Sequence, residues 1–167
     1  MIIWASTAKY LGITLDRTLR ANQITCSVNK EKAATALLMP LLGKSSKFNI
    51  KNKILFYNAV IRPAMLYGCE VWCSAAKTHL RKLQVIQNKT LRIITNAPYS
   101  VRNSIIHEDL QVVKIKLFIK DKALKIYIRY QYSDNPEISS LGNYDPTLMR
   151  RMPKVIVTAR YDQEWDY

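Results

Sequence analysis

Glycine is scarce in this sequence of 167 residues, which holds only four, all of them scattered. A phosphate-binding loop needs several glycines close together, so a loop of that kind is excluded. Long apolar runs are also missing, because the best candidate, AVIRPAMLYGCEVWCSAA, is interrupted by Arg62, Pro63 and Glu70. The opening MIIWASTAKY lacks the charged start and long apolar middle of a secretory signal. We therefore expect an intracellular protein of the nucleus or cytoplasm, not secreted and without a membrane span.

Residues suited to acid–base catalysis are few. The two histidines, His79 and His107, fall in different segments, and neither has a convincing nucleophile beside it. We interpret both as solvated or capping side chains. Glu108 and Asp109 are adjacent and would point about 100° apart on a helix, which suits a helix start better than an acid/base pair. No catalytic residue is predicted.

Cysteine is also rare, with three residues in the chain. Cys69 and Cys73 are four apart, and Cys26 is distant, whereas a structural zinc site needs a second ligand pair at close spacing. We interpret the cysteines as reduced, small hydrophobic side chains. Neither a metal site nor a cofactor is predicted for this chain.

Basic charge, in contrast, is abundant. Lys and Arg number 26 against 12 acidic residues, which gives a net charge of +14. Residues 1–133 carry 22 basic and 6 acidic side chains, whereas residues 134–167 carry 4 and 6. Such a field favours a polyanion, and nucleic acid is the commonest one inside a cell. An anionic membrane surface is the other physical option, but the basic stretch 112–131 lacks a clean apolar face.

Helical periodicity dominates residues 21–132. NKEKAATALLMPLLGK predicts a helix that ends at Gly43 and is kinked or shortened by Pro40. Asn49 predicts the N-cap of NIKNKILFYNAVIRP, and Pro63 suits the first turn of a further helix, PAMLYGCEVWC, which we expect to be buried. KTHLRKLQVIQNKTLRIITN is clearly amphipathic, and VVKIKLFIKDKALKIYIRYQ predicts a long basic helix. Ser104 is expected to cap a short helical turn between them.

These patterns predict a mainly α fold, a bundle of about five helices with a short N-terminal β-strand or hairpin. We divide the chain into residues 1–20 with the strand or hairpin, 21–132 with the helices, and an irregular segment 133–167. In the last segment, only KVIVTARY is suited to a short strand.

Three phrases in order carry a family resemblance: KYLGITLD, then LFYNAVIRPAMLYGCEVW, then LQVIQNKTLRIITNAPYSVRN. Together they resemble the region just after the catalytic palm in reverse transcriptases of non-LTR retrotransposons, most closely the jockey-type, LINE-like elements of arthropods. The resemblance runs from Trp4 to about Tyr132.

The resemblance implies that Tyr10, Leu11 and Gly12 lie in the primer grip, the β-hairpin that cradles the end of the growing strand. The helices would be the thumb and its extension, which hold a template–primer duplex or RNA–DNA hybrid by its backbone. In that family the palm carboxylates bind Mg²⁺, but no x-D-D motif occurs here, so we expect no polymerase activity from this chain alone.

The expected nucleic-acid contacts are the turn residues together with basic and aromatic side chains of the helical part. They are Tyr10, Leu11, Gly12, Lys44, Lys47, Lys51, Lys53, Arg81, Lys82, Lys89, Arg92, Tyr99 and Arg102. The cations would bind phosphates, and Tyr99, in a loop near Arg102, is the aromatic residue expected to be free to stack. The alternative is a helical protein-interaction module without a nucleic-acid role, which self-associates through exposed apolar surface or an unpaired strand edge.

Overall fold

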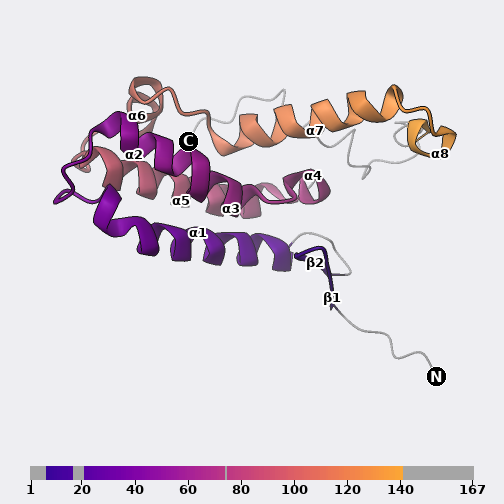
Figure 1. Cartoon of the computed structure of the whole chain (residues 1–167), viewed down its shortest axis with the longest axis horizontal. Helices are drawn as coiled ribbons and strands as arrows, with labels where there is room; N and C mark the ends of the chain where they lie inside the picture. The colour runs from indigo at the N-terminus through magenta and orange to yellow at the C-terminus, as the bar shows by residue number, and fades with distance from the viewer. Residues whose placement is uncertain (1–6, 17–20, 74, 141–167) are drawn as a thin grey trace.

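The computed structural model describes residues 7–16, 21–73 and 75–140, and these are mainly helical (Figure 1). Helix α1 (Ala21–Leu42) lies at the bottom of the view and helix α7 (Ile115–Gln131) at the top, with α5 (Lys77–Thr95) and the shorter α2 (Ile50–Phe56) and α3 (Arg62–Leu66) between them. The prediction of a mainly α bundle with an N-terminal hairpin is confirmed. The elements run in the following order: β1 (Thr7–Tyr10), β2 (Ile13–Asp16), α1 (Ala21–Leu42), α2 (Ile50–Phe56), the π-helical turn η1 (Tyr57–Ile61), α3 (Arg62–Leu66), α4 (Cys69–Trp72), α5 (Lys77–Thr95), α6 (Asn103–Asp109), α7 (Ile115–Gln131) and α8 (Pro136–Ser139).

The two strands form an antiparallel hairpin in which Tyr10 faces Ile13. Leu11 and Gly12 make the two-residue turn, with φ angles of 46° and 77°. Positive φ at both positions is the geometry of a type I′ turn, which matches the twist of the flanking strands. Glycine adopts this conformation without strain, whereas leucine does so at a cost.

Helices α2 and α3 are joined without a break through the π turn. The Asn49 side chain accepts a hydrogen bond from the Lys51 N–H at 3.3 Å, so the predicted N-cap is confirmed. Pro63 lies in the first turn of α3, as predicted, but the helical path does not restart there. Proline has no N–H and its ring clashes with the carbonyl four residues earlier. The wider turn, in which the Arg62 N–H bonds to Tyr57 O, accommodates it.

The apolar segment 63–73 is divided in two, which corrects the expectation of one buried helix. Gly68 has a φ of 64° and separates α3 from α4. Met65 and Trp72 are buried, but Tyr67 and Val71 are exposed. In α1, by contrast, Pro40 is followed by only two more helical residues, in line with an early end near Gly43.

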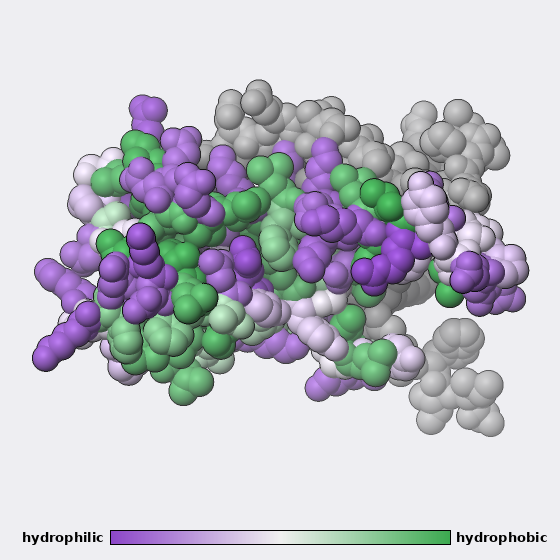
Figure 2. All heavy atoms as spheres, turned by 45° about the horizontal axis from the view of Figure 1, so that its top comes forward, coloured by the Kyte–Doolittle hydropathy of each residue, from purple (hydrophilic) through white to green (hydrophobic). Residues whose placement is uncertain are grey.

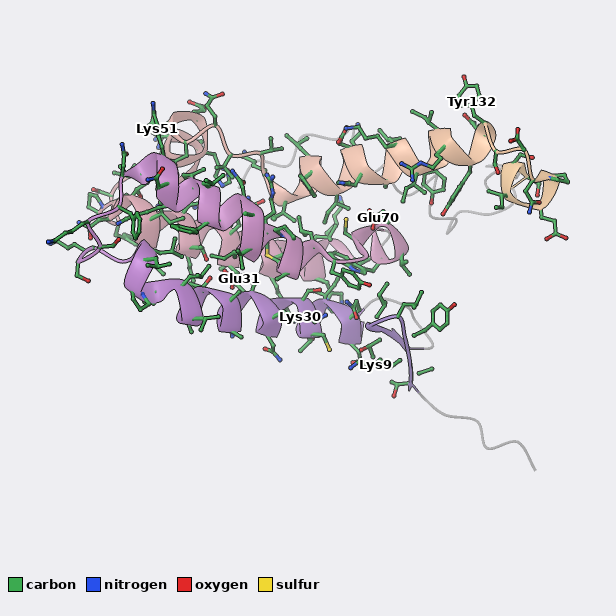
Figure 3. All side chains as sticks on the ribbon, viewed as in Figure 1. Lys9, Lys30, Glu31, Lys51, Glu70 and Tyr132 are labelled. Carbon is green, nitrogen blue, oxygen red and sulfur yellow. The ribbon has the colours of Figure 1, made fainter. Side chains whose placement is uncertain are left out.

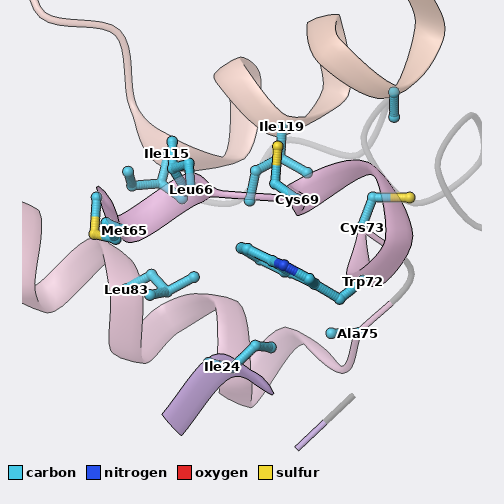
Figure 4. Close-up of a cluster of buried hydrophobic side chains, with 11 residues drawn as sticks. Ile24, Met65, Leu66, Cys69, Trp72, Cys73, Ala75, Leu83, Ile115 and Ile119 are labelled. Atoms are coloured by element: carbon cyan, nitrogen blue, oxygen red, sulfur yellow. The ribbon is translucent and has the colours of Figure 1, made fainter. Parts of the chain in front are cut away.

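Two clusters of buried hydrophobic side chains form the core. The first surrounds Trp72, whose indole N–H donates to Tyr67 O at 3.3 Å (Figure 4). It comprises Ile24, Met65, Leu66, Cys69, Trp72, Cys73, Ala75, Leu83, Ile115, Ile119 and Ala123. The second joins the end of α1 to η1, α5 and α6, and comprises Leu42, Tyr57, Ile61, Leu91, Ile94, Ile106 and Val112. Cys69 and Cys73 are buried free thiols as predicted, and burial raises the pKa of Cys69 to about 12.

A buried carboxylate links α1 to α5. Glu31 accepts hydrogen bonds from the hydroxyls of Thr90, at 2.5 Å, and Thr35, at 2.9 Å. Burial raises the pKa of Glu31 above its ordinary value, although the two hydroxyls oppose that shift.

Beyond α7, the short helix α8 lies in the segment expected to be irregular, and Asn135 caps it by accepting from the Glu137 N–H. The expected strand KVIVTARY lies outside the described residues.

Candidate nucleic-acid interface

The hairpin turn presents its predicted contact residues to solvent. Tyr10 and Leu11 are 66% and 72% exposed. The turn is tied to the helical body by the Tyr67 hydroxyl, which donates to Leu11 O at 3.0 Å, while the Thr14 N–H donates to Gln23 Oε1 at 2.8 Å. Lys30 lies over the Tyr67 ring, 5.4 Å from its centre. Figure 3 shows Lys9 at the hairpin and Lys30 on α1.

The opposite end carries a second group of predicted residues. Lys44, Lys47 and Lys51 are exposed in the connection from α1 to the start of α2. In Figure 2, long hydrophilic side chains project at this end of the molecule, and Figure 3 places Lys51 at the start of α2. Tyr99 is 97% exposed in the loop between α5 and α6, and Arg102 is exposed beside it. We call Lys44, Lys47, Lys51, Tyr99 and Arg102 the loop-end group.

Two predicted contact residues are engaged inside the fold. Lys53 is only 5% exposed, and its ammonium group donates to Gly43 O at 2.8 Å, which satisfies the last turn of α1. Lys53 was expected to bind phosphate, whereas its burial and this hydrogen bond place its ammonium group inside the fold. Arg92 donates to Pro98 O at 2.9 Å and to Asn103 Oδ1 at 2.9 Å. It also donates to Val101 O, so its charge holds the loop that carries Tyr99.

The remaining predicted cations lie along α5. Arg81 and Lys82 are exposed in its first turns, beside the Trp72 cluster, whereas Lys89 is exposed two turns later, near the second cluster. The structure therefore does not gather all the predicted residues into one groove. It separates the hairpin turn residues Tyr10, Leu11 and Gly12, the loop-end group, and the cations along α5.

His107 is buried in a polar network, which corrects its interpretation as a solvated or capping residue. Its Nδ1 lies 2.7 Å from Val112 O and its Nε2 lies 2.9 Å from Asn88 Oδ1. Burial lowers the pKa of His107, so the neutral ring is favoured. Gln87 in the same network donates to the Tyr57 hydroxyl at 3.0 Å.

The acidic pair after His107 lies at the opposite end of its helix from the one expected. Helix α6 runs from Asn103 to Asp109 with Arg102 as its N-cap residue, so Glu108 and Asp109 lie in its last turn and not in its first. Ser104 is inside the helix and does not cap it. The start of the helix could not be recognised in the sequence because its N-cap residue, Arg102, has no short capping side chain.

The described residues do not fit a Mg²⁺ site, since no group of three or more His, Cys, Asp or Glu side chains comes together among them. Within the same described part of the chain, no helix is both long and apolar enough to cross a membrane.

Comparison with known proteins shows what kind of protein carries this arrangement. The chain is 33% identical over 156 residues to a probable RNA-directed DNA polymerase from transposon X-element of Drosophila melanogaster. The aligned residues make up 92% of this chain and 17% of that protein. It is 35% identical over 135 residues to the RNA-directed DNA polymerase from mobile element jockey of Drosophila funebris, covering 80% of this chain and 15% of that protein. No protein-family model and no solved structure matches it.

These relatives are all RNA-directed DNA polymerases of mobile elements. The chain belongs to the jockey-type family of non-LTR retrotransposon reverse transcriptases, as the family resemblance predicted. It spans less than a fifth of the length of these curated relatives, 17% of the X-element protein and 16% of the jockey protein of Drosophila melanogaster.

Proposed function

We propose that this chain is the thumb-containing segment of a retrotransposon reverse transcriptase and binds a template–primer duplex or RNA–DNA hybrid by its backbone. In this proposal, residues 1–20 belong to the primer grip, residues 21–132 form the thumb and its extension, and residues 133–167 follow them. The 167 residues hold no x-D-D motif, so we expect them not to extend a primer on their own.

The observation that carries the proposal is the exposed cationic loop-end group of a chain with a net charge of +14. Three lysines are exposed along a stretch of eight residues, 44–51, and no acidic residue interrupts them. Phosphate contacts by Lys and Arg release counterions from the nucleic acid, which supplies affinity without reading sequence. Tyr99, which is almost fully exposed next to Arg102, adds a surface on which a base can stack.

The test is a titration of a short RNA–DNA hybrid by fluorescence anisotropy at several salt concentrations. Each phosphate contact contributes a slope of about one in log Kd against log salt, so the triple variant Lys44→Gln, Lys47→Gln and Lys51→Gln should lower the slope by about three. A second hybrid of unrelated sequence should bind equally well. Neutralising three exposed cations elsewhere, Lys32, Lys125 and Arg129, provides the matched control.

The proposal fails if the wild-type chain does not bind the hybrid at low salt. It also fails if the two triple variants lose the same slope, because the binding would then come from net charge and not from the loop-end group.

Apolar surface favours a second candidate function, self-association. Leu37 of α1 and Leu55 of α2 are 78% and 64% exposed, and both strands of the hairpin have no further partner strand among the described residues. Exposed apolar residues and free strand edges favour contacts between copies. Light scattering over a range of protein concentrations tests it, and a monomer at every concentration would exclude it.

A further inference from the structure

A pocket of about 510 Å³ lies between the hairpin turn, the π turn with α3 and α4, and α7. Leu11 of the turn, Asn58 of η1 and Phe118 of α7 line it, together with two basic side chains, Arg62 and Lys122. The loop-end group has no part in this pocket. The two cations therefore form a positive area of their own, next to the hairpin.

One aromatic ring brings the two cations together. The Arg62 guanidinium lies over the Phe118 ring, 4.8 Å from its centre, and the Lys122 ammonium lies 5.8 Å from the same centre. Arg62 comes from the start of α3, whereas Lys122 comes from α7. The electron-rich faces of the ring attract both cations and offset part of their mutual repulsion, so the ring holds them beside the pocket.

Neither cation is neutralised within the described part of the chain. Glu70 on α4 (Figure 3) is the acidic residue of the lining, but it forms no ion pair with Arg62 or Lys122. Among the described residues, none accepts a hydrogen bond from either side chain. The donors of a guanidinium lie in its plane, so a ring against its face leaves them available at its edge. Arg62 is half-buried and Lys122 is exposed, so an anion can reach both from solvent.

We infer that Arg62 and Lys122 form a phosphate-binding site at the hairpin end, which takes the phosphodiester backbone of a bound nucleic-acid strand. The inference rests on the proposed function and adds a second contact area to the loop-end group. Arginine and lysine are the usual partners of phosphate oxygens, and the planar guanidinium can bind two of them at once. The strand passes beside the turn, because the exposed Leu11 lines the same pocket.

A strand fits this site better than a free phosphate ion does. Exposed ion pairs contribute little on their own, so one small anion would be held weakly here. Along a polymer the contacts add, since binding at the loop-end group raises the effective concentration of the strand at the pocket. Two cations and one anion in the lining leave one net positive charge, which matches the single negative charge of a phosphodiester.

The first experiment is chemical footprinting of the full chain with the short RNA–DNA hybrid. Lysines are acetylated, arginines are modified with phenylglyoxal, and mass spectrometry of the peptides measures the extent at each position. The hybrid should protect Arg62 and Lys122, whereas Arg129 and Lys32, which are exposed outside the lining, should stay reactive. Inorganic phosphate at the same phosphate concentration should protect neither pair. Equal protection by the free ion would assign the site to a small anion and overturn the inference.

The second experiment measures the slope of log Kd against log salt for the hybrid. Arg62→Gln combined with Lys122→Gln should lower the slope by about two, and by about five when the loop-end triple variant is added. Arg129→Gln combined with Lys32→Gln has the same net charge and is the matched control, whose slope should not change. Lys122→Gln alone, at an exposed position, should lower the slope by about one and keeps the test valid if Arg62→Gln does not fold.

Glu70→Gln should act in the opposite direction, which a merely structural role would not produce. Removing the acid of the lining raises the net charge of the site, so the hybrid should bind about twofold more tightly at low salt. Glu137→Gln, at an exposed position on α8, is the control and should leave the affinity unchanged.

Equal slopes of the pair variant and its control, or no protection of Arg62 and Lys122, would overturn the inference. So would an affinity of Glu70→Gln no higher than that of Glu137→Gln. If the loop-end triple variant still lowers the slope in that case, the proposed function stands and only this site is refuted. If the pair variant lowers the slope and the loop-end triple variant does not, the site stands without the loop-end group. A chain that does not bind the hybrid refutes both.

Discussion

The two ends of the bundle are stabilised in different ways. At the loop end, Arg92 donates four hydrogen bonds to three neighbouring residues, and His107 and Gln87 join α5 to the segments around α6. At the hairpin end, the exposed turn is attached through single hydrogen bonds such as that from the Tyr67 hydroxyl to Leu11 O. Local stability varies with such contacts, so the loop end is expected to be preorganised and the hairpin to open at lower free energy.

Arg92 should show the largest effect. Arg92→Met keeps the aliphatic stem but removes the Arg92 donor from the Val101 carbonyl and from Asn103 Oδ1, while Pro98 O keeps only the Val101 N–H. Hydrogen bonds to a charged group contribute about 1.5–3 kcal/mol each, so we expect unfolding by urea to show a loss of about 2–3 kcal/mol. Lys89→Met, an exposed lysine one turn earlier, should change stability by less than about 0.5 kcal/mol. Equal stabilities of the two variants would contradict the picture of a preorganised loop end.

Gly68 should show the next largest effect, this time at the hairpin end. Its φ is 64°, and an added Cβ would collide with the Ile13 side chain. Gly68→Ala should therefore cost about 1–2 kcal/mol in thermal unfolding and increase amide exchange in β2. Gly68→Asn separates the two causes, because asparagine tolerates this backbone conformation but keeps the Cβ contact. If Gly68→Ala is as stable as wild type, β2 is not packed on this turn.

Leu11 should give a gain of stability. Its φ of 46° strains a leucine in the hairpin turn, and asparagine is preferred at this position of a type I′ turn. Leu11→Asn should stabilise the chain by roughly 0.5–1 kcal/mol, to be measured by thermal unfolding. The control is Leu55→Asn, at an exposed leucine within α2, which should not stabilise the chain. A loss of stability in Leu11→Asn would show that the leucine side chain makes contacts that outweigh the strain.

The smallest expected effect is a pH dependence that belongs to the loop end. Burial places the pKa of folded His107 below its unfolded value of 6.5, so the unfolded chain binds more protons between the two values. The contribution of neutral His107 to the free energy of unfolding is fully present above pH 6.5, and it is lost as the pH falls through the folded pKa. Urea unfolding at several pH values should show this decrease in wild type and in His79→Gln, but not in His107→Gln. A decrease that persists in His107→Gln would assign it to another group.

Local signals in the sequence predicted the elements well. Asn49 as a cap depends on neighbouring residues alone and was predicted correctly. Pro63 was correctly placed in a first helical turn, although the helix does not restart there. Lys53 and Arg92 were less predictable, because the same residue types serve equally at a surface and in a buried contact.

Contacts between distant residues were not predictable. Thr90 and Glu31 are 59 residues apart, and no periodicity of either helix reveals that their side chains meet. The pocket around Asn58 draws on the hairpin, η1, α3, α4 and α7, so its lining becomes visible only in three dimensions. Arg62 and Lys122, which line this pocket, were for the same reason not among the predicted contact residues.

The π turn has a consequence for how this helix tolerates change in length. It contains one more residue than a regular turn, so every side chain after it is rotated by about 100° relative to an uninterrupted α-helix. Tyr57 and Ile61 thereby reach the second cluster while Met65 and Leu66 reach the cluster around Trp72. Deleting a single residue between 57 and 61 would turn Met65 out of its cluster and bring the Pro63 ring against the carbonyl four residues earlier. The one additional residue of the π turn thus lets a single helical path contribute side chains to both buried clusters.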